Sequence, residues 1–476
     1  MLFFTKSIFS FAQWEGENYK PVKVIEKQKV SLSNLKEQKT QDLLERLKKL
    51  KNGEKLVIPN GEYKDLGIIK IKQNNIKISA ENPGQVIFSG KVQILISGDC
   101  NVFSDFIFVK GGPANSSGII CLLGNENKIV NNSFINFNIH DEKESDWITL
   151  KGSKNKILNN YFEGKTKRGQ IIVINKNLKK QDKHIIAQNI FKNHKSEDSI
   201  LKNEANGWEA IRTGTGKTAL HRNSEIEILY NLFINMDAEP ELISVKSSNT
   251  LLKGNTVISS IAGITLRQGR DNVVEDNVIL GMEKEGTRGI RFYDKGHVIR
   301  NNYIEGLRGK GNATGGLVSA TGVIDTKNGE ESQNKIISQW TPNNILIENN
   351  SFINSEQNIL YSDKIHSPNK RDNLVVEKVY PGYNLYFKNN LSYEENPNNY
   401  ALIGAEDMNP LDSEYENEVY FGKIKGVLNL PKGIDRNKPF LKRKQGILIE
   451  ENKNIGAKNL LILTENIIGP NYKIEN

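Results

Sequence analysis

The chain has 476 residues, of which 37% are hydrophobic and 25% charged, enough for a large core. Its net charge of +9 favours a polyanionic partner, such as nucleic acid, an anionic membrane or an acidic polysaccharide, although many lysines stand among asparagines, as on a solvated surface. Two cysteines exclude a disulfide framework, and six histidines without metal-binding spacing give no zinc motif.

Residues 1–13 are apolar and end in Ser10-Phe11-Ala12, a small-x-small pattern suited to signal peptidase. A charged segment before the apolar run is missing and Lys6 interrupts it, so a buried first strand is the alternative. We favour the remnant of a signal peptide and therefore expect a secreted or periplasmic protein. No later stretch is long and apolar enough to span a membrane.

A short amphipathic helix is predicted over residues 40–50, because its leucines share one face and Gly53 follows as a stop. A single helix before a long β region suits a cap over the open end of a sheet. Residues 56–61 and 68–72 are then predicted as strands, since both are apolar runs beside turn residues.

From about residue 75 the chain repeats a unit in which asparagines separate short apolar pairs, as in Asn127-Lys-Ile-Val-Asn-Asn-Ser-Phe134. Most copies are spaced by roughly 22 to 29 residues, the length of a solenoid coil. Asparagine suits such a corner because it tolerates left-handed backbone and can form ladders of stacked side chains. Aligned on the second asparagine, the copies fall at Asn132, Asn160, Asn189, Asn231, Asn255, Asn277, Asn302, Asn350 and Asn390.

Short, evenly spaced strands in one asparagine register predict an all-β protein, a single parallel β-helix. A β-sandwich is the alternative, but it gives less reason for one register. We expect one domain over residues 14–476, with coils over about 55–400 and an irregular C-terminal cap over about 400–476. The two longest gaps, 189–231 and 302–350, predict loops that border the binding face.

Glu239 and Glu241 are two residues apart, so their side chains share one face of an extended strand. Adjacent carboxylates repel unless a cation lies between them, and hard oxygen ligands favour Ca²⁺. Asn206, about one and a half coils earlier, can supply a neutral amide oxygen. The alternative is a glutamate pair in salt bridges with lysine or arginine of a neighbouring coil.

Lys246, Arg267 and Arg291 lie nine, ten and eleven residues before their corner asparagines. Nearly equal offsets predict equivalent places on successive coils, so we expect one column of three cations. Such crowding lowers the pKa of a lysine, as a general base requires. The alternative for a lone lysine in a repeat is a solvated surface residue.

The central coils contain four short motifs: Asn206-Gly-Trp-Glu-Ala-Ile-Arg212, Glu239-Pro-Glu241, Lys246-Ser-Ser-Asn249 and Leu266-Arg267-Gln-Gly269. Together these motifs resemble the signature of polysaccharide lyase family 6, which comprises alginate lyases and chondroitinase B. It implies a right-handed parallel β-helix and Ca²⁺-assisted β-elimination. Position by position, Asn206, Glu239 and Glu241 then match the calcium ligands, Lys246 the base, Arg267 the acid and Arg291 a substrate-binding arginine.

Gln268 stands where many members of the family have histidine, which leaves the substrate preference open. Tyr293 or water is a candidate for the final proton donor, because the very high pKa of arginine opposes full proton donation by Arg267. The expected substrate contacts are Arg212, Gln268, Arg270, Arg288, Arg291 and Tyr293.

Alginate is the expected partner, and dermatan sulfate is the alternative within the same chemistry. We expect a monomer with no nucleic-acid partner and no membrane span. Two other classes stay open: a β-helix glycoside hydrolase that uses Glu239 and Glu241 as acid and base, and a polysaccharide-binding protein without catalysis.

Overall fold

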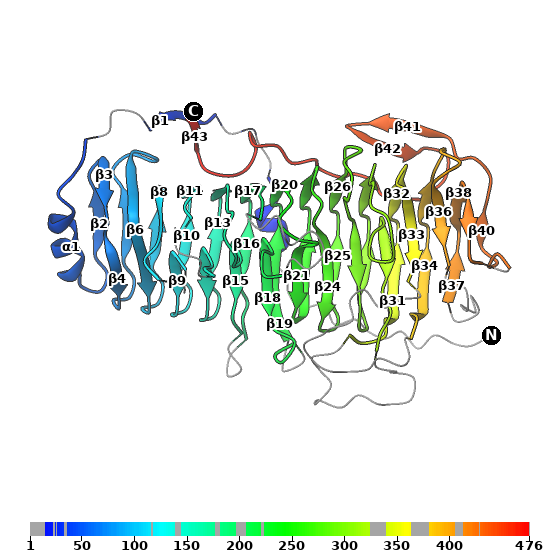
Figure 1. The fold of residues 1–476 in the computed structure, drawn as a ribbon, viewed down its shortest axis with the longest axis horizontal. Coiled ribbons are helices and arrows are strands. Elements are labelled where there is room, and N and C mark those ends of the chain that lie inside the picture. The colour runs from blue at the N-terminus through cyan, green and yellow to red at the C-terminus, as the bar shows by residue number, and fades with distance from the viewer. Residues whose placement is uncertain are drawn as a thin grey trace.

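The structure is a computed structural model that describes residues 15–21, 24, 26–32, 36–115, 118–138, 144–176, 181–196, 206–219, 223–323, 339–362, 380–404, 413–427 and 429–475. It confirms the predicted parallel β-helix: short strands stack in parallel, in three rows, along one long axis (Figure 1). The proposed signal-peptide remnant, residues 1–13, lies outside the described residues.

The first row is a sheet of thirteen strands in chain order. Its strands are β2 (Lys55–Ile58), β5 (Lys77–Ala80), β7 (Val102–Ser104), β10 (Lys128–Val130), β13 (Lys156–Leu158), β16 (Ile185–Ala187), β19 (Asn223–Leu229), β22 (Ser248–Lys253), β25 (Val273–Glu275), β28 (Val298–Arg300), β31 (Asn343–Glu348), β34 (Tyr383–Lys388) and β37 (Ser413–Glu416).

The second row follows the asparagine corner of each coil. Its strands are β3 (Gly61–Lys64), β6 (Val86–Ile96), β8 (Phe106–Pro113), β11 (Ser133–Ile135), β14 (Tyr161–Glu163), β17 (Ile190–His194), β20 (Leu232–Met236), β23 (Thr256–Ile258), β26 (Val278–Leu280), β29 (Tyr303–Glu305), β32 (Ser351–Ile353), β35 (Leu391–Tyr393), β38 (Glu418–Phe421) and β40 (Ile434–Asp435).

The third row carries the candidate site, and the long strand β6 joins it to the second row. Its strands are β4 (Gly67–Ile71), β9 (Ile120–Leu122), β12 (Ile148–Leu150), β15 (Ile172–Ile174), β18 (Ile211–Gly214), β21 (Glu241–Lys246), β24 (Gly263–Gln268), β27 (Ile290–Phe292), β30 (Leu317–Ser319), β33 (Gln357–Tyr361), β36 (Tyr400–Ile403) and β39 (Ile424–Lys425).

The helix α1 (Thr40–Lys48) lies at the N-terminal end of the solenoid and confirms the predicted capping helix to within two residues (Figure 1). Leu43 is buried in the main core, while Leu44 and Leu47 pack against it. A 3₁₀ turn, η1 (Gly16–Tyr19), precedes it. Among the described residues no helix is long and apolar enough to cross a lipid bilayer.

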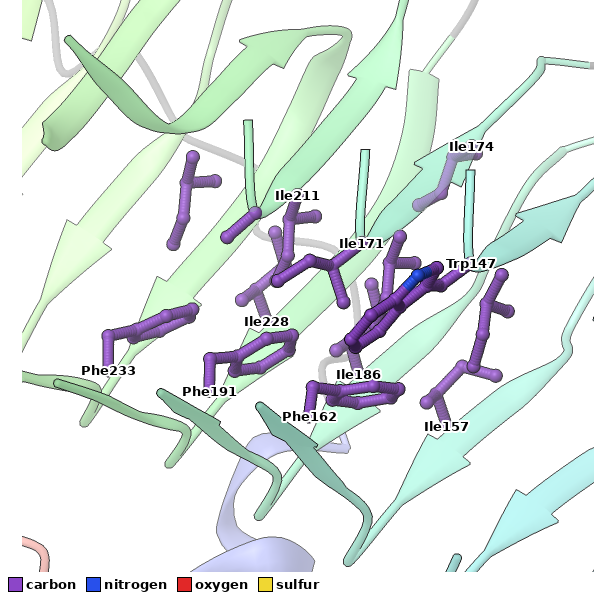
Figure 2. Packing of buried hydrophobic residues seen from close by; sticks show 14 of the residues in the cluster. Trp147, Ile157, Phe162, Ile171, Ile174, Ile186, Phe191, Ile211, Ile228 and Phe233 are labelled. Carbon is purple, nitrogen blue, oxygen red and sulfur yellow. The ribbon is translucent and has the colours of Figure 1, made fainter. Parts of the chain in front are cut away.

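The core is built from columns of identical or similar side chains, one per coil. Phe162, Phe191 and Phe233 stack with ring centroids 5.0 and 4.7 Å apart, and isoleucines from the first row face them (Figure 2). Parallel register places equivalent residues about 5 Å apart on neighbouring strands, which suits offset stacking of aromatic rings. The packing therefore fixes the register on which the site depends.

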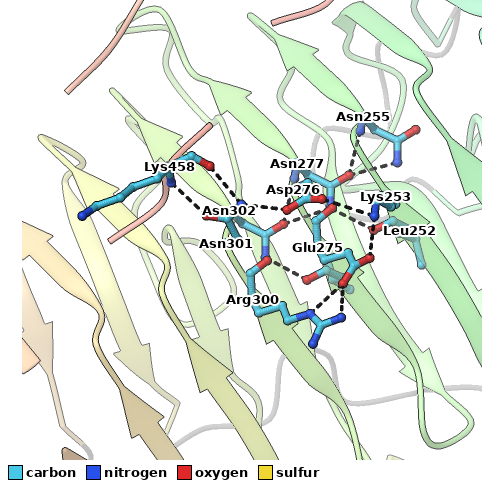
Figure 3. Close-up of polar contacts among 11 residues, drawn as sticks. Leu252, Lys253, Asn255, Glu275, Asp276, Asn277, Arg300, Asn301, Asn302 and Lys458 are labelled. Atoms are coloured by element: carbon cyan, nitrogen blue, oxygen red, sulfur yellow. Dashed lines mark hydrogen bonds and ion pairs between the residues drawn. The ribbon is translucent and has the colours of Figure 1, made fainter. Parts of the chain in front are cut away.

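The aligned asparagines form a buried ladder at the corner between the first two rows. The backbone amide of Asn277 donates to Asn302 Oδ1 (3.1 Å), and Asn255 donates to Asn277 Oδ1 (2.9 Å) in the same way (Figure 3). The left-handed backbone, however, belongs to the preceding residue: Asp276 has φ of 59° and Asn301 of 52°. The two roles predicted for one asparagine are thus divided between neighbours.

A row of alternating charges runs beside this ladder on the outside of the first sheet. Lys253 Nζ lies 3.1 Å from Glu275 Oε1, and Arg300 Nη2 lies 2.6 Å from Glu275 Oε2 (Figure 3). Their strands pair in register, so opposite charges stack from coil to coil. Lys388 and Glu416 form a further pair of this kind on β34 and β37.

The C-terminal segment differs from the expected end cap. Coil strands continue past residue 400 to β40, and after the hairpin of β41 (Leu441–Lys444) and β42 (Ile447–Glu450) the chain runs back along the solenoid (Figure 1). It ends in β43 (Tyr472–Glu475), which pairs in parallel with β1 (Gln28–Ser31). The last residues thus lie against N-terminal coils, because Tyr472 Oη reaches Phe106 O and Asn131 O.

Candidate active site

The predicted site residues meet near the middle of the third row, on β18, β21, β24 and β27 (Figure 1). These strands pair in parallel, and the outward positions Arg212, Ser244, Thr265 and Arg291 are register partners. A bulge between Val245 and Lys246 then shifts the pairing, so that Lys246 lies opposite Gln268. Bulges re-aim side chains next to active sites.

Three carboxylates form the acidic centre of the site. Oxygens of Glu209, Glu239 and Glu241 all lie within 4.8 Å of one another, the distance range of a shared cation. Glu239 Oε2 accepts a hydrogen bond from the Trp208 amide (2.8 Å), and Glu241 Oε2 accepts one from Ser244 Oγ (2.6 Å). The sequence analysis placed Glu209 in the first long insertion, residues 189–231, but did not predict it as a metal ligand.

The two glutamates predicted as ligands differ in their electrostatic surroundings. Burial, with Glu209 and Glu241 nearby, raises the pKa of Glu239 well above its usual value. Burial also acts to raise the pKa of Glu241, but Arg267, Arg291, Lys246 and Ser244 outweigh it and lower that pKa to about 2. The cluster thus holds excess negative charge on the side of Glu239, where a cation or a proton relieves it.

The cluster fits a hard divalent cation. Glu209 Oε1 is buried and has no hydrogen-bond partner among the described residues, which is costly for a carboxylate oxygen. Its position inside an all-oxygen donor set matches the ligands that Ca²⁺ prefers. Asn206, the third predicted ligand, is exposed three residues before Glu209, and its carbonyl accepts from Arg168 Nε (3.2 Å). Its side-chain oxygen as a ligand stays a prediction.

Lys246 lies at the edge of this cluster. Its Nζ is 3.7 Å from Glu209 Oε1, and 18% of its side chain is exposed against 1% for Glu209. Its backbone amide donates to Thr213 Oγ1 (3.1 Å), which fixes the strand end after the bulge. One side of the Lys246 amine therefore faces Glu209, and the other side is open to solvent.

Arg267 and Arg291 flank the cluster. Arg291 Nη2 binds Glu241 Oε1 at 2.6 Å, while Arg267 Nε lies 3.9 Å from the same oxygen. Arg267 Nη1 donates to Tyr293 Oη (3.2 Å). When the side-chain oxygen and nitrogen of Gln339 are assigned so that the oxygen faces Arg267, that oxygen also accepts from Arg267 Nη1 (2.8 Å). Burial acts to lower the pKa of Arg267, but Tyr293 and Glu241 outweigh it and raise that pKa.

The predicted single column of Lys246, Arg267 and Arg291 is wrong. Arg291 pairs with Thr265, and Lys246 with Gln268, so the three cations occupy different places on their coils. Spacing from the corner does not account for the register shifts between β21 and β24, the second of which leaves Arg267 without a register partner on β21. All three cations nevertheless lie close enough to Glu241 that each lowers the pKa of its carboxylate.

Tyr293 packs beneath two of the predicted arginines. It is fully buried, and its ring lies beneath the guanidinium groups of Arg267 and Arg291, 5.2 and 5.8 Å from the ring centroid. It therefore supports both arginines, and its role as a substrate contact or proton donor stays a prediction. Water is the other candidate for the final proton donor.

The other predicted substrate contacts surround the centre. Arg212 is half-buried with its Nε unpartnered among the described residues. Gln268 is nearly buried against Gly216. Arg270 Nε donates to Asp294 Oδ1 (3.1 Å), with its guanidinium 4.7 Å from the ring centroid of Trp340.

Arg288 lines a small hollow beside Arg291 and Thr265. Its Nη1 donates to the carbonyl oxygens of Ile261 (2.9 Å) and Gly286 (3.2 Å). Burial and the neighbouring Arg291 lower its pKa to about 10. The side chain is thus held by main-chain groups at the wall of the hollow.

Both long insertions contribute to this face, as predicted. Glu209 comes from the first insertion, and Gln339 and Trp340 come from the end of the second. Residues 197–205, 220–222 and 324–338 of these insertions lie outside the described residues.

Comparison with known proteins places this site in a family. The family model described as Chondroitinase B matches residues 37–456. The solved structure "a new PL6 alginate lyase complex with trisaccharide" shares 34% identity with a TM-score of 0.88, covering 98% of this chain and 99% of that one. The "complex structure of alginate lyase AlyF-OU02 with G6" also shares 34% identity, with a TM-score of 0.89 and coverage of 99% of each chain.

The structure of the PL6 family alginate lyase AlyGC, at 24% identity and a TM-score of 0.77, covers 92% of this chain and 58% of that one, and supports the fold. No curated protein matches the chain. Since a family model spans most of its length and two relatives at 34% identity cover nearly all of it, the chain belongs to polysaccharide lyase family 6.

Proposed function

We propose that this lyase cleaves alginate by Ca²⁺-assisted β-elimination, with Lys246 as the base and Arg267 at the leaving group. The observation that carries the proposal is the position of Lys246 Nζ, 3.7 Å from Glu209 in the acidic cluster and with an exposed side. A uronate whose carboxylate faces the cluster brings its C5 within reach of this amine.

Glu209, Glu239 and Glu241, with Asn206, are the residues that would hold calcium. When bound, Ca²⁺ supplies the Lewis-acid charge that makes the proton on C5 of a uronate more acidic. Lys246 Nζ accepts that proton. The C5–H electron pair forms the C4–C5 double bond as the C4–O4 bond breaks.

Arg267 stabilises the departing O4 by hydrogen bonding. Its raised pKa opposes the loss of its own proton, so we assign the final proton to water. Tyr293 is buried behind the guanidinium and orients it, and Arg291 holds Glu241 in the cluster. Arg212, Arg270 and Arg288 are assigned to flanking uronates, for which a guanidinium fork is well suited.

The choice of alginate rests on the two relatives at 34% identity, whose structures are described as alginate lyases. Dermatan sulfate is the second candidate, because the family model carries the name of chondroitinase B. Membership of a lyase family argues against the glycoside hydrolase and the silent binding protein.

Incubation with alginate and, separately, dermatan sulfate tests the proposal. Elimination leaves an unsaturated uronate that absorbs ultraviolet light, and mass spectrometry identifies the products. Absorbance growth with alginate supports the assignment. Growth with dermatan sulfate alone replaces alginate by the second candidate, and products without absorbance refute elimination.

We also propose that the enzyme works in the periplasm or outside the cell, where such polymers occur. The pattern of residues 1–13 supports this location. Fractionation of expressing cells, followed by N-terminal sequencing of the exported form, tests it, and retention of the uncleaved chain in the cytoplasm contradicts it.

A further inference from the structure

An acidic column leads into the site from the N-terminal side, and one member is neutral. Four isoleucines, Ile148, Ile172, Ile211 and Ile243, are register partners on β12, β15, β18 and β21. Two residues before each of them stand, in order, Asp146, Gln170, Glu209 and Glu241. Gln170 thus separates the carboxylate of Asp146 from that of Glu209.

Gln170 binds the carboxylate that faces the base. Its Nε2 donates to Glu209 Oε2 at 2.7 Å, and both side chains are almost completely buried. With Oε2 held in this way, Oε1 is the oxygen left 3.7 Å from Lys246 Nζ. This hydrogen bond fixes the orientation of the Glu209 carboxylate.

The main chain of Gln170 is itself fixed. Its amide donates to Asp146 Oδ1 (2.9 Å), and the next amide, that of Ile171, donates to Glu209 O (3.3 Å). The side chain therefore starts from a defined place beside Glu209. Support of this kind keeps functional groups in the geometry that their chemistry needs.

The Gln170 side chain donates a hydrogen bond to Glu209 but leaves its own carbonyl oxygen unpaired in the core. Its Oε1 is buried and lacks a hydrogen-bond partner among the described residues. A buried unpaired acceptor is destabilising, and an apolar side chain of similar size avoids it. Packing alone therefore gives no reason for an amide here.

We propose that Gln170 is a positioning residue of the lyase site: it orients Glu209 toward the cation and Lys246 without adding a fourth charge to the column. The inference rests on the proposed function, because it assigns the turned oxygen of Glu209 to calcium. Groups that orient metal ligands commonly change metal affinity or activity by 10- to 100-fold when removed.

The test measures Ca²⁺ binding by isothermal titration calorimetry on the full chain, first stripped of metal. We expect Gln170→Met to raise the Kd for Ca²⁺ about tenfold or more and to lower kcat at saturating Ca²⁺. The matched control is Gln93→Met, since Gln93 is a buried glutamine on β6 whose Nε2 donates to Gly118 O (2.9 Å). The control should lower Tm and leave the Kd unchanged.

A lower Tm for Gln170→Met with Kd and kcat within about twofold of the parent enzyme overturns the inference. If Gln170→Met does not fold, Gln170→Glu replaces it, because it keeps the length and regains a donor when protonated. Its kcat relative to the parent should then rise as pH falls, and a ratio independent of pH counts against the hydrogen bond. Failure of the parent enzyme to bind Ca²⁺ or cleave alginate refutes the proposed function instead.

Discussion

Lys246 Nζ and Glu209 Oε1 lie 3.7 Å apart, on consecutive coils of the solenoid, although Glu209 belongs to an insertion in the repeat. Glu209 is closed off from solvent and Lys246 is partly open to it. The pair therefore links the buried acidic cluster to the surface on which a polymer lies. The chemistry proposed for the site depends on this link.

The first prediction concerns the base. Lys246→Ala should lower kcat by about 10²- to 10⁴-fold, the range for losing a general base, while alginate binding stays measurable. Lys246→Arg should be similarly inactive, because arginine does not give up its proton near neutral pH. Formation of the unsaturated uronate measures turnover.

Lys253→Ala is the control for Lys246→Ala. Lys253 is also a half-buried lysine paired with a glutamate, Glu275, but it lies on the first row of strands. It should keep full activity. Equal losses in both variants would show that the effect at Lys246 is structural.

The second prediction concerns calcium and pH. Chelation should abolish activity and added Ca²⁺ should restore it, and Glu239→Gln should weaken binding by removing one charge from the donor set. Because the pKa of Glu239 is raised, its carboxylate gains a proton first as pH falls, and Ca²⁺ must displace that proton. The Kd should therefore rise as pH falls, which calorimetry can follow. Unchanged turnover after thorough calcium removal would contradict this reading of the glutamates.

The third prediction concerns Tyr293. Tyr293→Phe keeps the ring beneath Arg267 and Arg291 but removes the hydroxyl that accepts from Arg267 Nη1. Arg267 contacts the departing oxygen mainly in the transition state. A less firmly held guanidinium should therefore lower kcat about tenfold and leave KM nearly unchanged. If Tyr293 itself delivered the proton, the loss would approach that of Lys246→Ala.

The repeat made much of the fold and the site predictable from sequence. The asparagine positions identified the coils because a buried ladder needs the same residue at each corner, as Asn255, Asn277 and Asn302 show. Glu239, Glu241 and Lys246 stood out because charged residues close together in the sequence contrast with apolar coils, and the structure brings them together although Glu239 lies just before the strand β21.

What sequence reasoning missed depends on geometry that spacing does not encode. The register shift at Arg267, between β21 and β24, breaks the equal offsets that predicted one column of cations. Glu209 lies in an insertion, so its place beside Lys246 follows only from the register of β18 and β21. The return of the C-terminal segment to β1 joins residues far apart in the chain, and no local pattern marks it.

The fourth prediction concerns Glu418, which ends the asparagine ladder. Its Oε1 accepts from the backbone amide and Nδ2 of Asn390 (2.8 and 3.0 Å), while Oε2 has no partner among the described residues. Burial raises the pKa of Glu418 to about 8, so the folded protein keeps a proton that the unfolded chain releases near its usual pKa of about 4.5.

Because the folded state binds more protons between these two values, this group's contribution to the free energy of unfolding declines as pH rises from about 4.5 to about 8. Glu418→Gln keeps an acceptor for Asn390 and does not titrate, so it should flatten the decline and exceed the parent in Tm above about pH 8. Denaturant or thermal unfolding at several pH values measures this. Glu416→Gln, at an exposed glutamate of the preceding strand, is the control and should leave the slope unchanged. Parallel pH profiles for the parent and Glu418→Gln would mean that Glu418 is charged in the fold and that the ladder ends on a carboxylate.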